Sequence, residues 1–287
     1  REYSNANPDL NIGSLMKQTL SIVKVGSNII EDDKGFVQIL DLFSKMPGNK
    51  IMVHGGGKKA TQIGNKLGIE AKMINGRRIT DEKSLEIAIM VYGGLVSKQI
   101  VAQLQAFGTN AIGMSGADAN AIIAHKRPVT KVDFGYVGDV DKVNAYGIFK
   151  LLQAGFTPIF CALTHNGKGQ LFNTNADTIA AEVAIAMSDQ FDTTLYYCFE
   201  KKGVLEDVED ENSVITHINS KTYEELLAYG IISNGMLPKM HNCFYALRNQ
   251  VNKVCIGDIS MLEEGNPNFT TLTPYENRPK HSNRKSH

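Results

Sequence analysis

The most informative segment of the sequence is Lys50-Ile51-Met52-Val53-His54-Gly55-Gly56-Gly57-Lys58-Lys59-Ala60. Its apolar residues 51–53 predict a buried strand, and the spacing of Ala60, Ile63 and Leu67 is typical of one face of a helix. A strand, a glycine-rich turn and a helix point backbone N–H groups, and the positive end of a helix dipole, at an anion. Because glycine lets a ligand approach the backbone closely, we interpret the loop as a candidate oxyanion site.

Strand-like and helix-like segments alternate along the rest of the chain. The main strands are expected at residues 20–25, 51–53, 111–114, 121–124, 157–163, 194–199 and 253–256. The helices are expected at residues 36–43, 60–67, 81–107 after a Thr80-Asp81 cap, 142–154, 176–187, 223–229 and 237–251. This alternation predicts an α/β fold, a three-layer αβα sandwich with a mainly parallel central sheet. Ligands of such folds bind at the carboxyl ends of the strands.

Composition narrows the class of protein. The chain has 287 residues, 43% of them hydrophobic, which is enough for one large domain or two lobes. Lys and Arg total 30 and Asp and Glu total 30, and this balance argues against a general binder of nucleic acid or membrane surfaces. The four cysteines form no C-x-x-C pair, and we see neither a secretory signal nor an apolar run of about 20 residues. We therefore expect a cytoplasmic protein without a zinc site.

The two ends of the chain have no apolar periodicity. Residues 1–17 are rich in Asn, and we expect a loose N-terminal extension there. Residues 274–287 are polar and basic, and we expect them to be either disordered or foreign to the native chain. The folded part is therefore expected at residues 18–273.

Basic residues near the predicted ligand edge could bind anions. Lys24 lies inside an apolar strand, where a lysine is costly unless it meets an anion or the strand is an edge strand facing water. Arg77 and Arg78 precede a helix cap and could offer paired donors to a carboxylate, although solvated surface arginines fit the same spacing. Lys239 opposes the dipole in the first turn of its helix, which suggests a compensating anion; an exposed lysine is the alternative.

The segment Asn173-Thr174-Asn175-Ala176-Asp177 opens a helix that is apolar on most faces. Asn and Asp are common helix caps, so capping alone could account for them. Their place at the ligand edge of the sheet also allows a binding role. Two other interpretations of the glycine loop are open. One is a plain tight turn, and the other is the dinucleotide fingerprint formed by Gly55, Gly57 and Ala60. We discount the fingerprint because the loop does not follow the first strand of the domain.

Taken in order, these motifs resemble the amino acid kinase family, and most closely its N-acetylglutamate kinase branch, over residues 20–273. The motifs are K-x-G at 24–26, HGGG at 54–57, NGRRIT at 75–80, SGAD at 115–118, GYVGDV at 135–140, NTNAD at 173–177 and GMLPK at 235–239. The resemblance implies ATP-dependent phosphorylation of the side-chain carboxylate of an N-acylated L-glutamate, an early step of arginine biosynthesis. The acyl group is either acetyl or succinyl.

The resemblance also implies roles for individual residues. Lys24 and Lys239 would stabilise the migrating phosphoryl group, and Asp177 would hold the two lysines in place. The acylglutamate would be bound by Gly56, Gly57, Arg78, Asn173 and Asn175. The ATP would be bound by Gly26, Ser27, Glu200, Gly203, Val204, Leu205, Ile231, Ser233 and Gly235. Mg²⁺ would be held mainly through the nucleotide phosphates, and no metal-ligating residues are assigned.

The resemblance further implies an N-lobe at residues 18–180 for acylglutamate binding and dimerisation, and a nucleotide-binding C-lobe at 181–273. We expect a homodimer that uses residues 91–105, without arginine feedback. Two departures from the usual motifs keep alternatives open: Ser27 in K-V-G-S is also typical of glutamate 5-kinases, and Glu200 stands where an Asp is usual. The alternatives are a glutamate 5-kinase-like small-acid kinase, a catalytically silent ligand sensor of this fold, and a dinucleotide-binding dehydrogenase.

Overall fold

The computed structural model describes residues 17–274 except 75, 208 and 233–235. The predicted N-terminal extension and C-terminal tail therefore lie almost wholly outside the described residues. Lys17 is described, and its ammonium donates a hydrogen bond to the Ser188 carbonyl at 2.8 Å. The described residues thus start one residue before the expected folded part.

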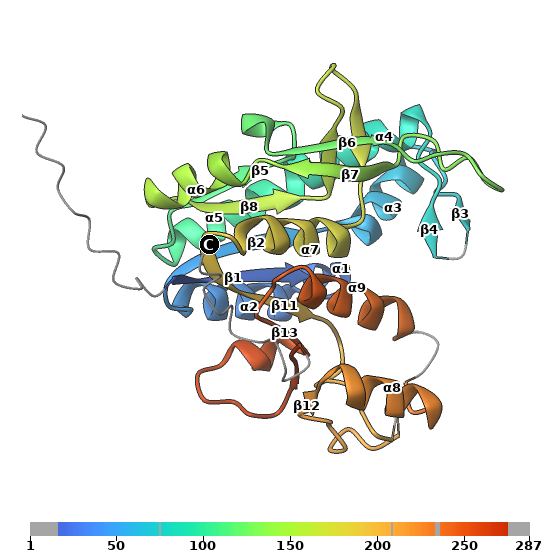
Figure 1. Cartoon of the computed structure of the whole chain (residues 1–287). Helices are drawn as coiled ribbons and strands as arrows, with labels where there is room; N and C mark the ends of the chain where they lie inside the picture. Colours follow the sequence, from blue (N-terminus) through green and yellow to red (C-terminus); the bar gives the residue numbers. More distant parts are fainter. Residues whose placement is uncertain (1–16, 75, 208, 233–235, 275–287) are drawn as a thin grey trace, which may run out of the picture.

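The core of the molecule is an eight-stranded sheet (Figure 1). Its strands, in spatial order, are β12 (His217–Ile218), β14 (Thr270–Leu272), β13 (Lys253–Gly257), β11 (Phe191–Cys198), β1 (Gln18–Val25), β2 (Asn49–His54), β8 (Thr157–Cys161) and β5 (Ala111–Met114). Every neighbouring pair is parallel except β13 and β14. The predicted mainly parallel sheet is confirmed, and β1 lies near its centre rather than at an edge.

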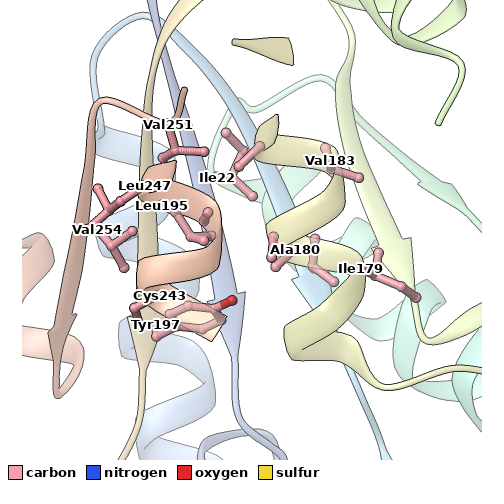
Figure 2. Close-up of a cluster of buried hydrophobic side chains, with 14 of the residues drawn as sticks. Ile22, Ile179, Ala180, Val183, Leu195, Tyr197, Cys243, Leu247, Val251 and Val254 are labelled. Atoms are coloured by element: carbon pink, nitrogen blue, oxygen red, sulfur yellow. The ribbon is translucent and has the colours of Figure 1, made fainter. Parts of the chain in front are cut away.

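Helices cover both faces of this sheet, because successive side chains of the central strands point to opposite faces and are apolar on both. Leu20 and Ile22 face a layer formed by α6 (Ala145–Gln153), α7 (Ala176–Met187), α8 (Ser220–Ala228) and α9 (Leu237–Arg248). Figure 2 shows side chains of α7 and α9 packed over Ile22 and Leu195 in this layer.

Val23 and Val25 point the other way, into the second helical layer. That layer contains α1 (Ser27–Glu31), α2 (Asp33–Lys45), α3 (Gly57–Lys66), α4 (Glu82–Ala88), the π-helix η1 (Ile89–Val96) and α5 (Ser97–Ala106). The predicted αβα sandwich is therefore confirmed, and the alternation of buried side chains along β1 is its physical basis.

The segment Glu82–Ala106 is a continuous helix of 25 residues whose centre is the π-helix η1. Asp81 caps it, since its carboxylate accepts a hydrogen bond from the Ser84 N–H at 2.9 Å. By length and composition the helix could cross a membrane, since an 18-residue window of it has a mean hydropathy of 1.4. Val91, Ile100 and Leu104 are nevertheless buried against the sheet, as in the core helix of a globular protein.

Two smaller sheets were not expected from the sequence. One contains β10 (Leu171–Asn173), β9 (Leu163–His165), β6 (Ile122–Lys126) and β7 (Gly138–Val143), and the other pairs β3 (Met73–Ile74) with β4 (Arg77–Arg78). The expectation of a helix from residue 142 is wrong at its start, because Lys142 and Val143 pair with β6. The helix begins at Ala145, after Asn144 accepts a capping hydrogen bond from the Gly147 N–H.

Several other elements begin or end at residues different from those expected. The strand expected at residues 157–163 is interrupted at Ala162, between β8 and β9, and β11 begins at Phe191 rather than at 194. Helix α9 ends at Arg248 instead of 251, because Gln250 adopts a positive φ of 76° that a helix cannot contain. Two short 3-10 helices, η2 (Asp118–Asn120) and η3 (Ile259–Leu262), complete the described elements.

Candidate active site

The carboxyl ends of β1 and β2 and the first turn of α7 meet around a cavity of about 400 Å³. Most of the predicted catalytic and substrate-binding residues line it, namely Lys24, Gly56, Gly57, Arg78, Asn173, Asn175 and Asp177. A second cavity of about 550 Å³ shares Arg78, Asn173, Asn175 and Asp177 with the first and contains Lys239. The structure therefore brings together residues from five separate sequence motifs at the expected edge of the sheet.

Lys24 and Asp177 form an ion pair at the centre of this region. The Lys24 Nζ lies 2.7 Å from the Asp177 Oδ1, and both side chains are mostly buried. On β1, Lys24 points to the same face as Leu20 and Ile22, which are fully buried. The alternative of an edge-strand lysine facing water is wrong, since β1 pairs with strands on both sides.

Lys239 lies in the first turn of α9 and is partly buried. Its Nζ lies 4.4 Å from the centroid of the Phe199 ring. Burial lowers the pKa of Lys239, the charge of Lys24 lowers that pKa further, and the carboxylate of Asp177 raises it. Asp177 thus acts electrostatically on both lysines, although its ion pair among the described residues is with Lys24.

The glycine loop joins β2 to α3. Gly56 is the N-cap of α3 and has a φ of 154°, which a residue with a side chain rarely adopts. A Cβ on Gly56 would lie 2.8 Å from Cδ1 of Tyr92, whereas a Cβ on Gly55 would meet no atom within 4 Å. The need for glycine is therefore strict at position 56 and weak at position 55.

His54 ends β2 immediately before these glycines and is fully buried. Its Nδ1 lies 2.8 Å from the Gly55 carbonyl oxygen. Desolvation by burial lowers the pKa of His54 to about 4, so the ring is neutral near pH 7. A neutral ring with a protonated Nδ1 can donate to that carbonyl and restrain the start of the loop.

Arg78 on β4 is anchored to the helix that follows the loop. Its Nη2 donates hydrogen bonds to the Gly57 carbonyl at 2.9 Å and to Thr61 Oγ1 at 2.6 Å. These bonds orient the guanidinium at the wall of the cavity, so Arg78 is not a freely solvated surface arginine. Arg77 is exposed and lines the second cavity.

The two predicted asparagines have different partners. The Asn175 side chain caps α7, accepting hydrogen bonds from the N–H groups of Asp177 at 2.7 Å and Thr178 at 3.2 Å. The capping interpretation therefore holds for Asn175, which also lines both cavities. The Asn173 Nδ2 instead donates to Thr80 Oγ1 at 3.0 Å.

The predicted nucleotide-binding residues are more dispersed. Ser27 lines the first cavity and Glu200 lines a separate cavity of about 300 Å³ beside Asp258. Gly26 immediately precedes α1, and Ile231 follows α8. Ser233 and Gly235 lie outside the described residues.

The remaining predicted nucleotide residues, Gly203, Val204 and Leu205, are buried. A Cβ on Gly203 would lie 2.6 Å from Thr270 Oγ1, and the Val204 N–H donates to that oxygen at 2.8 Å. Gly203 and Val204 thus pack against β14, whereas Leu205 forms an isolated bridge with Val214, and a role of the three residues in ATP binding stays a prediction.

Sequence reasoning missed several residues of the site. Thr61, Tyr92 and Arg127 line the cavities, and the Arg127 Nη2 lies 2.6 Å from the Asp139 Oδ1. Tyr92 belongs to the apolar stripe of its helix, so periodicity predicts burial for it and nothing more. Only the distance between Tyr92 and Gly56 in space reveals that it belongs to the site.

Two lysines, an arginine and a glycine loop around two adjoining cavities form a site suited to transferring a phosphoryl group between anions. Comparisons with known proteins agree with that class. The profile of the amino acid kinase family matches residues 19–258. The chain belongs to the amino acid kinase family, and the resemblance found in the sequence is confirmed.

Individual relatives are similar over nearly their whole length. The acetylglutamate kinase of Phocaeicola vulgatus is 53% identical over 250 residues, which is 87% of this chain and 97% of the relative. The acetylglutamate kinase of Bacteroides thetaiotaomicron is 50% identical over 249 residues, again 87% and 97% of the two chains. Among solved structures, the Streptococcus mutans UA159 protein smu.665 has a TM-score of 0.71 and 25% identity, covering 88% of this chain and 98% of its own.

Proposed function

We propose that this chain is an ATP-dependent acylglutamate kinase, which phosphorylates the γ-carboxylate of N-acetylglutamate to an acyl phosphate in arginine biosynthesis. The observation that carries the proposal is the Lys24–Asp177 pair, which lies in one cavity with Arg78 and the glycine loop. Relatives about half identical over almost their full length are named acetylglutamate kinase. An acylglutamate kinase brings two anions together, ATP and the carboxylate of its substrate, and the cations of this site suit both.

The residues of the cavity suit this chemistry. The attacking carboxylate is ionised near pH 7, so no general base is needed. The charge on the migrating phosphoryl group must be stabilised, and Lys24 and Lys239 are the cations placed for it on β1 and α9. Arg78 would bind the carboxylate that does not react, and the N–H groups of Gly56 and Gly57 would face the oxygens of the reacting groups.

Mg²⁺ would supply further charge neutralisation on the phosphates of ATP. The carboxylate nearest the catalytic lysines is that of Asp177, and Lys24 already occupies its Oδ1. This donor set fits a metal ion that is held through the phosphates rather than by a cage of carboxylates. The nucleotide itself would bind on the C-lobe side, residues 181–273, with the acylglutamate held by the N-lobe, residues 18–180.

The residues that line the second cavity bear on whether the substrate carries an acetyl or a succinyl group. Arg77 and Arg127 line it together with Lys239, next to the residues that it shares with the first cavity. A succinyl group carries a carboxylate that these cations could attract, whereas an acetyl group does not. N-succinylglutamate is therefore the second candidate substrate, and kinetics with the two acylglutamates side by side distinguish them.

The assembly and the location of the protein belong to the same proposal. Met90 and Leu95 are exposed apolar residues of η1. Leu95 lies within residues 91–105, where the dimer contact is expected, and Met90 directly precedes that range. A homodimer through this helix would cover them. We further propose a cytoplasmic enzyme that arginine does not inhibit, which turnover with and without added arginine tests.

An ATP-coupled hydroxamate assay tests the central proposal, because hydroxylamine traps acyl phosphates. We expect product with N-acetylglutamate or N-succinylglutamate, and much less with unacylated glutamate. Product formed only with free glutamate would favour the glutamate 5-kinase-like alternative. No product with any of the three would favour the silent ligand sensor, and protection from heat by NAD but not by ATP would favour a dehydrogenase.

A further inference from the structure

Tyr92 lies outside every motif that the sequence singles out, yet it lines the first cavity of the site. It belongs to η1, the π-helical part of the long helix, and it lines the first cavity while only 4% of its surface is exposed. Single π-helical turns often occur at functional sites, since the extra residue redirects the side chains around it.

The ring of Tyr92 packs directly beneath the glycine loop. An added Cβ on Gly56 would lie 2.8 Å from Cδ1 and 3.2 Å from Cε1 of that ring. The ring therefore occupies the space that a side chain at Gly56 would need. Tyr92 and Gly56 are complementary, and the ring supports the loop from below.

The hydroxyl reaches the next part of the site. It lies 3.8 Å from the position of a Cβ on Gly57, and the positive charge of Arg78, which lines the same cavity, acts on it. A guanidinium has no acceptor atom, so Arg78 cannot take up the phenolic proton of Tyr92, which stays available to another acceptor. Burial raises the pKa of Tyr92, with a smaller opposite effect from Arg78, so the hydroxyl is protonated near pH 7.

Inside the described part of the chain, no carbonyl or carboxylate oxygen accepts the Tyr92 hydroxyl proton. We propose that Tyr92 is a substrate-contacting residue whose hydroxyl donates a hydrogen bond to the α-carboxylate held by Arg78, an inference that rests on the proposed acylglutamate kinase function. The ring positions the glycine loop and the hydroxyl completes the carboxylate site. Tyr92 is thereby a determinant of acylglutamate affinity.

The variant Tyr92→Phe tests this, because it keeps the ring under Gly56 and removes only the hydroxyl. We expect the KM for the acylglutamate to rise about tenfold, the size expected for one hydrogen bond to a charged group, with the KM for ATP nearly unchanged. Tyr196→Phe is the matched control: that tyrosine is half-buried on β11 and is not among the described residues lining the two cavities. It should leave both KM values unchanged.

A substrate analogue distinguishes a direct hydrogen bond between the Tyr92 hydroxyl and the substrate from a purely structural role of Tyr92. With the α-carboxamide of the acylglutamate, the penalty of Tyr92→Phe should shrink to about threefold or less, because neutral acceptors make weaker hydrogen bonds than carboxylates. An equal penalty on both substrates, or a lower melting temperature with wild-type KM values, would overturn the inference. If the wild-type protein neither binds nor turns over an acylglutamate, as calorimetry and the hydroxamate assay would show, the proposed function and this inference both fail.

Discussion

The Lys24 Nζ lies 2.7 Å from the Asp177 Oδ1, and this ion pair joins the central strand β1 to the first turn of α7. The two residues are far apart in the sequence and meet only because α7 packs over β1. The pair gives a partly buried ammonium a compensating charge and fixes its direction at the cavity wall.

Replacing Lys24 by Ala should lower kcat by at least about 10²-fold, because one preorganised donor to the migrating group is removed. The KM for ATP should change much less. Lys45→Ala is the control, since that lysine is exposed and pairs with Asp41 one turn away on α2. Turnover of Lys24→Ala within a few-fold of wild type would exclude a role in phosphoryl transfer.

The alkaline side of the pH profile should report the charge of Lys239. Burial lowers the pKa of Lys239, so kcat should decline at a pH below the range of an ordinary lysine. Asp177 raises that pKa, so removing its charge in Asp177→Asn should move the alkaline decline of the residual activity to lower pH.

Steady-state kcat measured from about pH 7 to about pH 10 checks this expectation. The variant Lys239→Arg supplies the comparison, since a guanidinium stays charged throughout and its residual activity should lack the decline. An alkaline decline that is identical in wild type and Lys239→Arg would assign it to another group.

Gly56→Ala should damage both stability and acylglutamate turnover, because the new methyl group meets the Tyr92 ring and the backbone has a φ of 154°. We expect a loss of about 1–3 kcal/mol in the free energy of unfolding, seen as a lower melting temperature. Acylglutamate affinity should fall more than ATP affinity, which titration calorimetry measures. Gly55→Ala, where a Cβ meets no atom within 4 Å, should behave like wild type; equal effects at both positions would contradict the assignment.

His54 should make the protein less stable in mild acid. Its pKa is about 4 in the folded protein against an ordinary value of 6.5, so the unfolded chain binds more protons between these values. Stability from this group is complete above about pH 6.5 and is lost as the pH falls toward 4, up to about 3 kcal/mol in all.

Urea unfolding at several pH values tests the His54 prediction. The variant His54→Gln should show a weaker fall in stability between about pH 6.5 and about pH 5, because Gln cannot take up the proton. The same pH dependence in both proteins would show that other groups are responsible. The comparison isolates His54 because all other titrating groups are shared.

Local patterns in the sequence were sufficient for the layers of the fold and for many of the site residues. Apolar strands alternating with amphipathic helices predicted the αβα sandwich, because side-chain period and chain connectivity leave few other arrangements. Lys24 in an apolar strand predicted a buried anion partner, and the structure supplies Asp177. Gly56 was recognised as a loop glycine from its neighbours along the chain.

Tertiary structure alone decided the rest. Strand β7 forms because Lys142 and Val143 pair with β6, a contact between distant segments that overrides their local helical pattern. Gly203 and Val204, predicted from a motif to bind ATP, pack against Thr270. Tyr92 joins the site only because the long helix passes beneath the glycine loop. The apolar periodicity of a helix or strand indicates which of its faces is buried. Which other element covers that face depends on how the elements pack in three dimensions.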